Sequence, residues 1–165
     1  MVRLVTPSQK YKKGYMAGLR ELMKKSAHPE ILKRETENFP AYLEEVKNAA
    51  KGVTKGVSRS EYWLVDGDTY IGMIQIRHRP SGRYQNLKSN IYYDVRPSKR
   101  RKGYGTKILE LGLKRARKLG LKKIIATCDE NNVASRKIIE KNGGVLKEKV
   151  KTPEGVVLKY FIRVR

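Results

Sequence analysis

A basic, glycine-containing segment at residues 96–106 carries residue types that bind phosphate. Its sequence is Arg96-Pro97-Ser98-Lys99-Arg100-Arg101-Lys102-Gly103-Tyr104-Gly105-Thr106. It follows a predicted strand and precedes a predicted helix, whose N-terminus presents unpaired N–H groups and a partial positive charge. The two glycines have no Cβ, so an anion can approach the backbone closely, and the arginine and lysine side chains add charge-assisted donors. The segment therefore predicts a binding site for a di- or polyphosphate.

The spacing of the glycines distinguishes this segment from two common phosphate loops. It lacks both the Gly-Lys-Ser/Thr ending of a P-loop and the three glycines of a dinucleotide-binding fingerprint. It resembles instead the acetyl-CoA loop of the GNAT acetyltransferase superfamily, Arg/Gln-x-x-Gly-x-Gly/Ala between the fourth strand and the third helix. Here the match is Arg100-x-x-Gly103-x-Gly105.

A second motif of that superfamily, Asn-x-x-Ser/Ala at the start of the next helix, is matched by Asn132-Val133-Ala134-Ser135. Gly143 lies where the superfamily has a glycine near the end of that helix. The stretch 95–144 is most similar to the ribosomal-protein N-acetyltransferase-like branch and its uncharacterised bacterial relatives. The order of predicted elements agrees with that of the superfamily along nearly the whole chain.

The resemblance implies acetyl-CoA as the co-substrate, with no metal, and a role for each matched residue. Main-chain N–H groups from 101 to 106 would hold the pyrophosphate. The backbone from Tyr93 to Val95 would pair with the pantetheine arm and polarise the thioester carbonyl, and Asn132 and Ser135 would reach the pantetheine side. The implied cofactor-binding residues are Tyr93, Val95, Arg100, Arg101, Lys102, Gly103, Tyr104, Gly105, Thr106, Asn132 and Ser135.

The chain departs from the superfamily where its catalytic acid and base usually stand. Ile139 occupies the position of the tyrosine that protonates the leaving thiolate, and Ser89 and Asn90 lie where many relatives have a glutamate base. Water can relay protons in their place. We name two other residues as catalytic candidates: His78, a base or an idle strand-end histidine, and Asp94, which lies beside the thioester or pairs with a nearby lysine.

Two further residues have alternative readings. Glu61 either faces the acceptor cleft or is a solvated acid at the start of a strand. Cys128, the single cysteine, is expected to be packed, since no histidine accompanies it nearby. One cysteine excludes an intrachain disulfide, and no Cys/His grouping predicts a metal site.

The elements that must position these residues follow from the periodicity of the apolar side chains. Helical spacing predicts helices at 9–25, from 40 to 50, 103–119 and 132–141, with His28-Pro29 ending the first. Strands are predicted at 3–5, 61–66, 69–78, 90–95, 122–128, 145–150 and 156–164. This order predicts one acyltransferase domain over residues 1–165, of the α/β class: a mixed, mostly antiparallel central sheet of about seven strands flanked by about four helices.

The charge of the chain leaves two classes of function open. Lys plus Arg is 38 against 16 Asp plus Glu, which gives +22, and a protein with this balance attracts polyanions non-specifically. One class is an N-acetyltransferase that moves an acetyl group from acetyl-CoA to a primary amine by direct attack on the thioester. The other is a polyanion-binding protein (RNA or ribosome) of the same fold with little or no catalytic activity.

The remaining expectations concern location and partners. The sequence has neither a signal-like N-terminus nor the roughly 20 apolar residues of a membrane span. We expect a cytoplasmic monomer or homodimer without a membrane partner. Its amine acceptor would be a small molecule, a peptide or a protein N-terminus.

Overall fold

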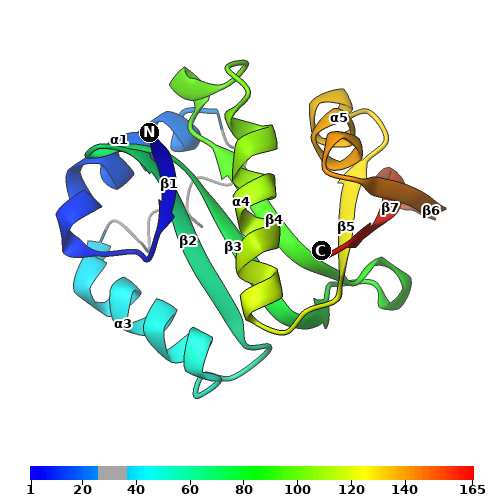
Figure 1. The fold of residues 1–165 in the computed structure, drawn as a ribbon, viewed down its shortest axis with the longest axis horizontal. Helices are drawn as coiled ribbons and strands as arrows, with labels where there is room; N and C mark the ends of the chain where they lie inside the picture. Colours follow the sequence, from blue (N-terminus) through cyan, green and yellow to red (C-terminus); the bar gives the residue numbers. More distant parts are fainter. Residues whose placement is uncertain (26–36) are drawn as a thin grey trace.

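The computed structural model describes residues 1–25 and 37–165, so the predicted break at His28-Pro29 lies outside the described residues. The helices and strands follow in this order (Figure 1): β1 (Val2–Val5), α1 (Lys12–Met23), α3 (Phe39–Lys51), β2 (Arg59–Asp66), β3 (Thr69–Ser81), β4 (Ser89–Val95), α4 (Tyr104–Lys118), β5 (Lys123–Asp129), α5 (Val133–Lys141), β6 (Gly144–Thr152) and β7 (Gly155–Arg163). The predicted α/β class and the predicted order of elements are confirmed.

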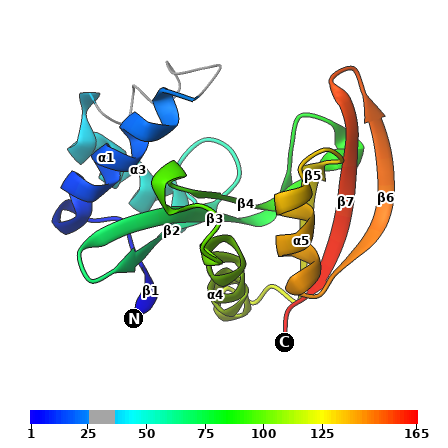
Figure 2. The ribbon, with the colours of Figure 1, turned by 90° about the horizontal axis from the view of Figure 1, so that it is seen from above.

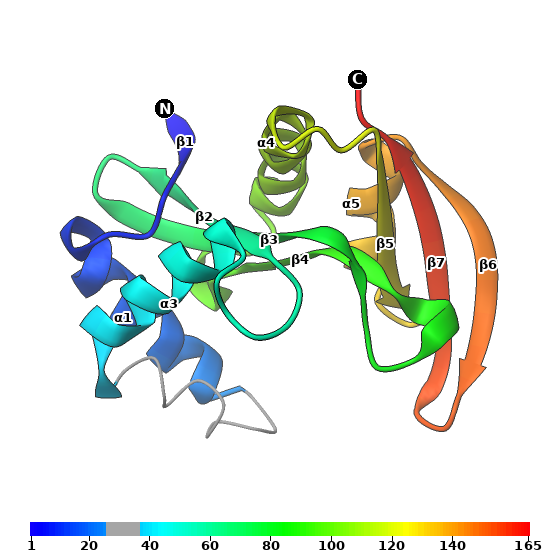
Figure 3. The same cartoon turned by 90° about the horizontal axis from the view of Figure 1, so that it is seen from below.

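The strands form two antiparallel sheets, one in the order β1-β2-β3-β4 and one in the order β5-β7-β6. Helices cover both faces of the first sheet: α4 lies on one face, and α1 and α3 lie on the other (Figure 2). Helix α5 packs against the second sheet (Figure 3). The layers therefore bring α4 and α5 together on the side where the two sheets meet.

Two apolar cores fill the spaces between these layers. One lies between the first sheet and α4 and continues under α5 to the second sheet. The other joins α1 and α3 to the opposite face of the first sheet, where the ring of Tyr15 stacks on Trp63 with centroids 4.2 Å apart. Successive side chains of β2 point to opposite faces of the sheet, so Leu64 lies in the first core and Trp63 in the second.

Side chains join the two sheets where β4 and β5 begin. The main-chain N–H of Ile125 donates to the side-chain oxygen of Asn90 at 3.0 Å, and the hydroxyl of Ser89 donates to the carbonyl of Ile125 at 3.1 Å. The amide nitrogen of Asn90 donates to the carbonyl of Arg77 on β3. The expected sheet is thus divided between β4 and β5, because these polar side chains replace the main-chain ladder there.

None of the helices in residues 1–25 and 37–165 is both long and apolar enough to cross a membrane.

Candidate functional site

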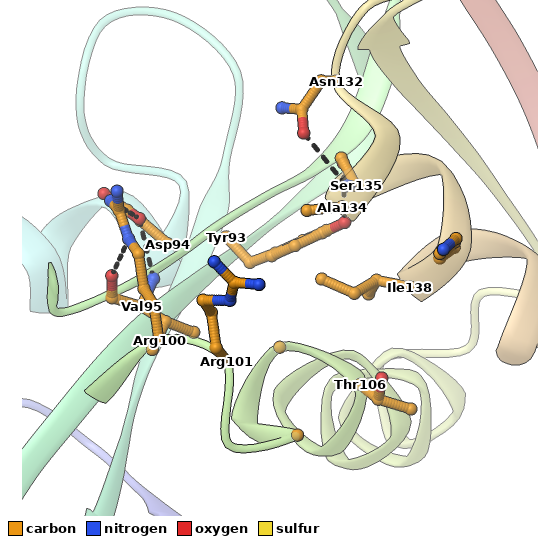
Figure 4. A pocket seen from close by; sticks show the side chains of 13 residues that line it. Tyr93, Asp94, Val95, Arg100, Arg101, Thr106, Asn132, Ala134, Ser135 and Ile138 are labelled. Atoms are coloured by element: carbon orange, nitrogen blue, oxygen red, sulfur yellow. Dashed lines mark hydrogen bonds and ion pairs between the residues drawn. The ribbon is translucent and has the colours of Figure 1, made fainter. Parts of the chain in front are cut away.

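A pocket of about 500 Å³ lies between the end of β4, the N-terminus of α4 and the first turns of α5 (Figure 4). We call it the α4 pocket. Nine of the eleven predicted cofactor-binding residues line it, and Lys102 and Tyr104 do not. Its lining comprises Tyr93, Asp94, Val95, Arg100, Arg101, Gly103, Gly105, Thr106, Asn132, Ala134, Ser135, Lys137 and Ile138.

The N-terminus of α4 forms one end of the α4 pocket. Gly103 precedes the helix in the left-handed conformation, with φ 78°, and it has no side chain to accept bonds from the first turn. The first N–H groups of a helix have no carbonyl partner within it, so those from Tyr104 to Thr106 can donate to an anion. Arg101 is also left-handed, with φ 61°. This end of the pocket combines open main-chain donors with positive charge.

Gly105 serves helix packing as well as access to the backbone. A Cβ at this position would lie 2.5 Å from the Cδ1 atom of Ile138 on α5. The absence of a side chain lets α4 approach α5 closely at the α4 pocket, which both residues line.

Arg100 fixes the loop to the end of β4. Its Nε donates to the carbonyl of Val95 at 2.8 Å, and its guanidinium pairs with the carboxylate of Asp94 at 2.9 Å. Asp94 also accepts the main-chain N–H of Val95 at 2.7 Å. Asp94 therefore lies in the pocket with its charge paired to an arginine, rather than to the lysine considered from the sequence.

The main chain of Tyr93 is directed toward the α4 pocket. Successive residues of a strand direct their N–H and C=O groups to opposite sides. The main-chain N–H of Arg96 donates to the carbonyl of Ile71 on β3. The main-chain groups of Val95 and Tyr93 consequently point away from β3. The N–H of Val95 is already bound by Asp94, so Tyr93 offers the N–H best placed for a ligand that lies along β4.

The side chain of Tyr93 crosses from β4 to α5, where its hydroxyl lies 2.8 Å from that of Ser135 (Figure 4). Burial raises the pKa of the Tyr93 phenol to about 12. Asn132 caps α5, as predicted, by accepting the N–H of Ser135 at 3.0 Å. These three side chains form the end of the α4 pocket opposite the α4 N-terminus.

A second pocket, of about 430 Å³, adjoins the first and shares Tyr93, Asn132 and Ser135 with it. We call it the β5 pocket. It opens between β4 and β5 and extends to the β3–β4 loop and the β6–β7 hairpin. Its lining comprises Arg83, Tyr84, Leu87, Ile91, Tyr92, Tyr93, Ala126, Thr127, Cys128, Asp129, Asn132, Ser135, Thr152, Glu154 and Val157.

Polar groups from distant parts of the chain meet in the β5 pocket. The hydroxyl of Tyr84 donates to Glu154 at 2.9 Å, and Arg83 pairs with the same carboxylate at 3.4 Å. These contacts lower the pKa of Glu154, with the Tyr84 hydrogen bond as the largest cause. Cys128 is buried, as expected, and burial raises the pKa of its thiol.

Three residues singled out from the sequence lie elsewhere. The ring of His78 is 2.9 Å from the hydroxyl of Ser60, and His78 is absent from the lining of both pockets. Ile139 is 1% exposed in the first core, so the usual tyrosine position does not line the α4 pocket. The expectation of a solvated Glu61 is wrong: its side chain is buried and accepts hydrogen bonds from Tyr42, Trp63 and Gln75.

Several lining residues were not foreseen. Ala134, Lys137 and Ile138 lie on the same side of α5 as Ser135, and helical spacing from Ser135 was the signal that could have found them. Asp129 and Glu154 bring carboxylates to the β5 pocket, and no local motif marks either of them. In residues 1–25 and 37–165 there is no group of three His, Cys, Asp or Glu residues that could hold a metal ion.

Comparison with known proteins gives a family model and a set of similar folds. The model described as Acetyltransferase (GNAT) domain matches residues 11–145. No curated protein sequence matches the chain significantly. The solved structure of RimL, described as a ribosomal L7/L12 alpha-N-protein acetyltransferase in complex with coenzyme A, is 14% identical with a TM-score of 0.76, covering 99% of this chain and 94% of that chain.

Two further structures are similar along nearly the whole chain. The microcin C7 self-immunity acetyltransferase MccE, in complex with acetyl-CoA and AMP, has a TM-score of 0.74 at 14% identity, covering 99% of this chain and 92% of that chain. RimJ of Mycobacterium smegmatis, in complex with CoA-disulfide, has a TM-score of 0.72 at 17% identity, covering 98% and 81%. At these identities the likeness shows a shared fold.

Proposed function

This chain belongs to the GNAT acetyltransferase family, whose domain model covers residues 11–145, and from that premise we propose that it transfers an acetyl group from acetyl-CoA to a primary amine. The amine attacks the thioester carbonyl directly, the C–S bond breaks, and the CoA thiolate leaves. The proposal takes residues 1–165 as one catalytic domain.

The observation that carries the proposal is the open N-terminus of α4 at one end of the α4 pocket. Gly103 offers no cap to the first turn, so the N–H groups from Tyr104 to Thr106 are available to the pyrophosphate of CoA. Arg101 and Lys137 add positive charge along the same lining. Arg100 acts through its bonds to Val95 and Asp94, which hold the loop in place.

The pantetheine arm would run from this end along β4 toward Tyr93, Asn132 and Ser135. Tyr93 would donate its main-chain N–H to the thioester carbonyl, whose oxygen gains negative charge as the amine attacks. Holding the amine and the thioester in this geometry would account for a large part of the rate.

The acceptor amine would occupy the β5 pocket, because this pocket meets the α4 pocket at Tyr93, Asn132 and Ser135. The exposed carboxylate of Asp129 would attract an ammonium ion to this pocket. An amine must lose a proton before it attacks, and water in this open pocket would accept it. We propose Asp94 as a positioning residue for the loop; the catalytic role of His78 stays a prediction.

The leaving thiolate does not require an acid at position 139. A thiol has a pKa near 8.5, so an unassisted thiolate is a tolerable leaving group at neutral pH. Because Ile139 lies in the core, the thiolate would take its proton from water or from the attacking nitrogen, which loses a proton as the amide forms.

Two measurements test the proposed function together. Acetyl-CoA at about a hundred times its Kd should stabilise the protein by about 2.7 kcal/mol, which is about 5–10 °C in Tm for a chain of this size. Acetyl-pantetheine, which lacks the pyrophosphate, should stabilise it far less. Release of free CoA against a panel of peptides, diamines and aminoglycosides would then identify the amine. The absence of any Tm shift with saturating acetyl-CoA would refute the assignment.

A second candidate function is polyanion binding, which the distribution of charge favours. Residues 96–123 hold twelve Lys or Arg against the single acid Glu110. Lys107 and Lys114 pair with Glu110, whereas Arg117 and Lys118 are exposed on α4. This face would bind RNA or a ribosomal surface.

A further inference from the structure

Tyr93 and Ser135 lie where the two pockets meet. Both residues line both pockets, and their hydroxyls are 2.8 Å apart. Tyr93 comes from β4 and Ser135 from the first turn of α5, so the hydrogen bond spans the opening between these elements (Figure 4). We call this pair the partition.

Packing and hydrogen bonding hold the partition in place. The ring of Tyr93 packs against the first core, as the side chain of Ile138 also does. Ser135 is fixed from the other side, because its main-chain N–H donates to Asn132 at the helix cap. Since the pKa of the Tyr93 phenol is about 12, the phenol keeps its proton and the hydrogen bond at neutral pH.

We propose that the partition limits the acyl donor to short chains, with Tyr93 as the residue that sets the chain length. The inference rests on the proposed function, since it takes the α4 pocket as the CoA site. With the pyrophosphate at the α4 N-terminus, the acyl end of the donor points toward the partition. An acetyl group stops in front of the Tyr93 ring, whereas each added methylene is pressed against it.

The expected size of the effect follows from how strongly binding pockets distinguish acyl chains of different length. One methylene that a pocket cannot accommodate changes kcat/KM by about 10–200-fold. Removing the ring of Tyr93 widens the region where the α4 pocket meets the β5 pocket and gives the added methylenes space. The preference for acetyl should then fall, although the phosphate end of the site is unchanged.

The experiment measures CoA release from acetyl-, butyryl- and hexanoyl-CoA with one amine acceptor. In the wild-type protein, kcat/KM should fall by at least about 100-fold from acetyl- to hexanoyl-CoA, and in Tyr93→Ala by less than about 10-fold. A merely structural role would lower kcat/KM for all three donors equally. Tyr92→Ala is the matched control, because Tyr92 lines the β5 pocket alone, and it should keep the wild-type preference.

Two results would overturn the proposal that the partition limits the length of the acyl chain. A folded Tyr93→Ala protein that keeps the 100-fold preference overturns it, and so does a Tyr92→Ala protein that loses the preference. If Tyr93→Ala does not fold, Tyr93→Leu removes the ring and its hydroxyl while keeping an apolar side chain against the core.

Binding measurements separate this inference from the proposed function. Calorimetry of acetyl-CoA and hexanoyl-CoA needs no amine and no turnover. The wild-type protein should bind hexanoyl-CoA more weakly than acetyl-CoA, and Tyr93→Ala should bind the two alike. Absence of CoA release with every amine would refute acetyl transfer alone, whereas equal wild-type affinities for the two donors would refute the partition.

Discussion

Gly103 is the residue on which the proposed pyrophosphate site depends most directly. Its φ of 78° lies in the left-handed region, which costs other residues about 1–2 kcal/mol. A Cβ at this position would meet no atom within 4 Å, so a side chain would fit the fold, and Gly103 lines the α4 pocket. The position therefore separates effects on binding from effects on folding.

We predict that Gly103→Glu lowers the affinity for CoA at least about tenfold, which corresponds to about 1.4 kcal/mol. The reason is repulsion between the new carboxylate and the pyrophosphate. Gly103→Ala is the matched control, because it carries the same backbone strain without the charge. Calorimetry with CoA checks both variants, and equal affinity of folded Gly103→Glu and Gly103→Ala would show that phosphate binds elsewhere.

Ile139 illustrates how burial overrides a motif position. Its Cγ2 atom fills the space where a Cβ at Gly144 would lie, at 2.3 Å. We predict that Ile139→Tyr lowers the free energy of unfolding by about 1–3 kcal/mol, because the larger ring overpacks the core. Urea denaturation measures this loss. A variant as stable as the wild type and faster in CoA release would show that the ring reaches the α4 pocket.

At the scale of elements, the buried Glu61 connects α3 to the first sheet. It accepts hydrogen bonds from Tyr42 of α3 and from Trp63 and Gln75 of the sheet. Burial is the largest cause that acts on its pKa, and it raises the pKa above the ordinary value of 4.5. Burial thus favours the protonated acid in the folded state.

The raised pKa predicts how stability depends on pH. As pH rises, the unfolded chain loses this proton near pH 4.5, before the folded protein does. The stability that Glu61 contributes through this proton is therefore fully present below that pH, and it is lost as pH rises through the raised pKa of the folded protein. We predict that Glu61→Gln gains stability relative to the wild type on going from about pH 4 to about pH 7.5. Denaturation at both pH values measures the gain, and a difference that is constant with pH would contradict it.

The link between β4 and β5 gives a second prediction for the elements. Asn90 is 2% exposed and bonds both the N–H of Ile125 and the carbonyl of Arg77. Asn90→Ala leaves both of these part-buried groups without this partner, at a cost of about 1–3 kcal/mol for an unsatisfied group. We expect a loss of this size in urea denaturation, together with weaker CoA binding as the strands lose their spacing. Unchanged stability would show that water replaces the side chain.

For the whole molecule, the net charge of +22 separates the two candidate functions through their dependence on salt. CoA held by main-chain donors and a few bases should lose affinity modestly as salt rises. Binding of a nucleic acid through residues 96–123 should fall by about 10³–10⁵ between about 50 and 200 mM salt, if about 6–10 phosphates are contacted. Titration of both ligands at the two salt concentrations measures this contrast. Nanomolar nucleic-acid affinity at the higher concentration, without CoA release, would favour the polyanion-binding function.

The sequence by itself determined the order of the elements and identified the segment that we propose as the phosphate site. Both depend on local patterns: the period of apolar residues defines each helix and strand, and residues 100–106 combine glycines, bases and a helix N-terminus within one contiguous segment. A site built from neighbouring residues needs no knowledge of how distant segments pack.

Only the tertiary structure decided how β4 and β5 are joined, what closes the α4 pocket and which carboxylates reach the β5 pocket. Tyr93 and Ser135, whose hydroxyls form a hydrogen bond, are 42 positions apart in the sequence, and Tyr84 and Glu154 are 70 positions apart. Ile139 and Glu61 are buried for the same kind of reason, since packing of several elements determines which face of each is covered. No local period encodes such contacts, because they depend on the relative placement of whole elements.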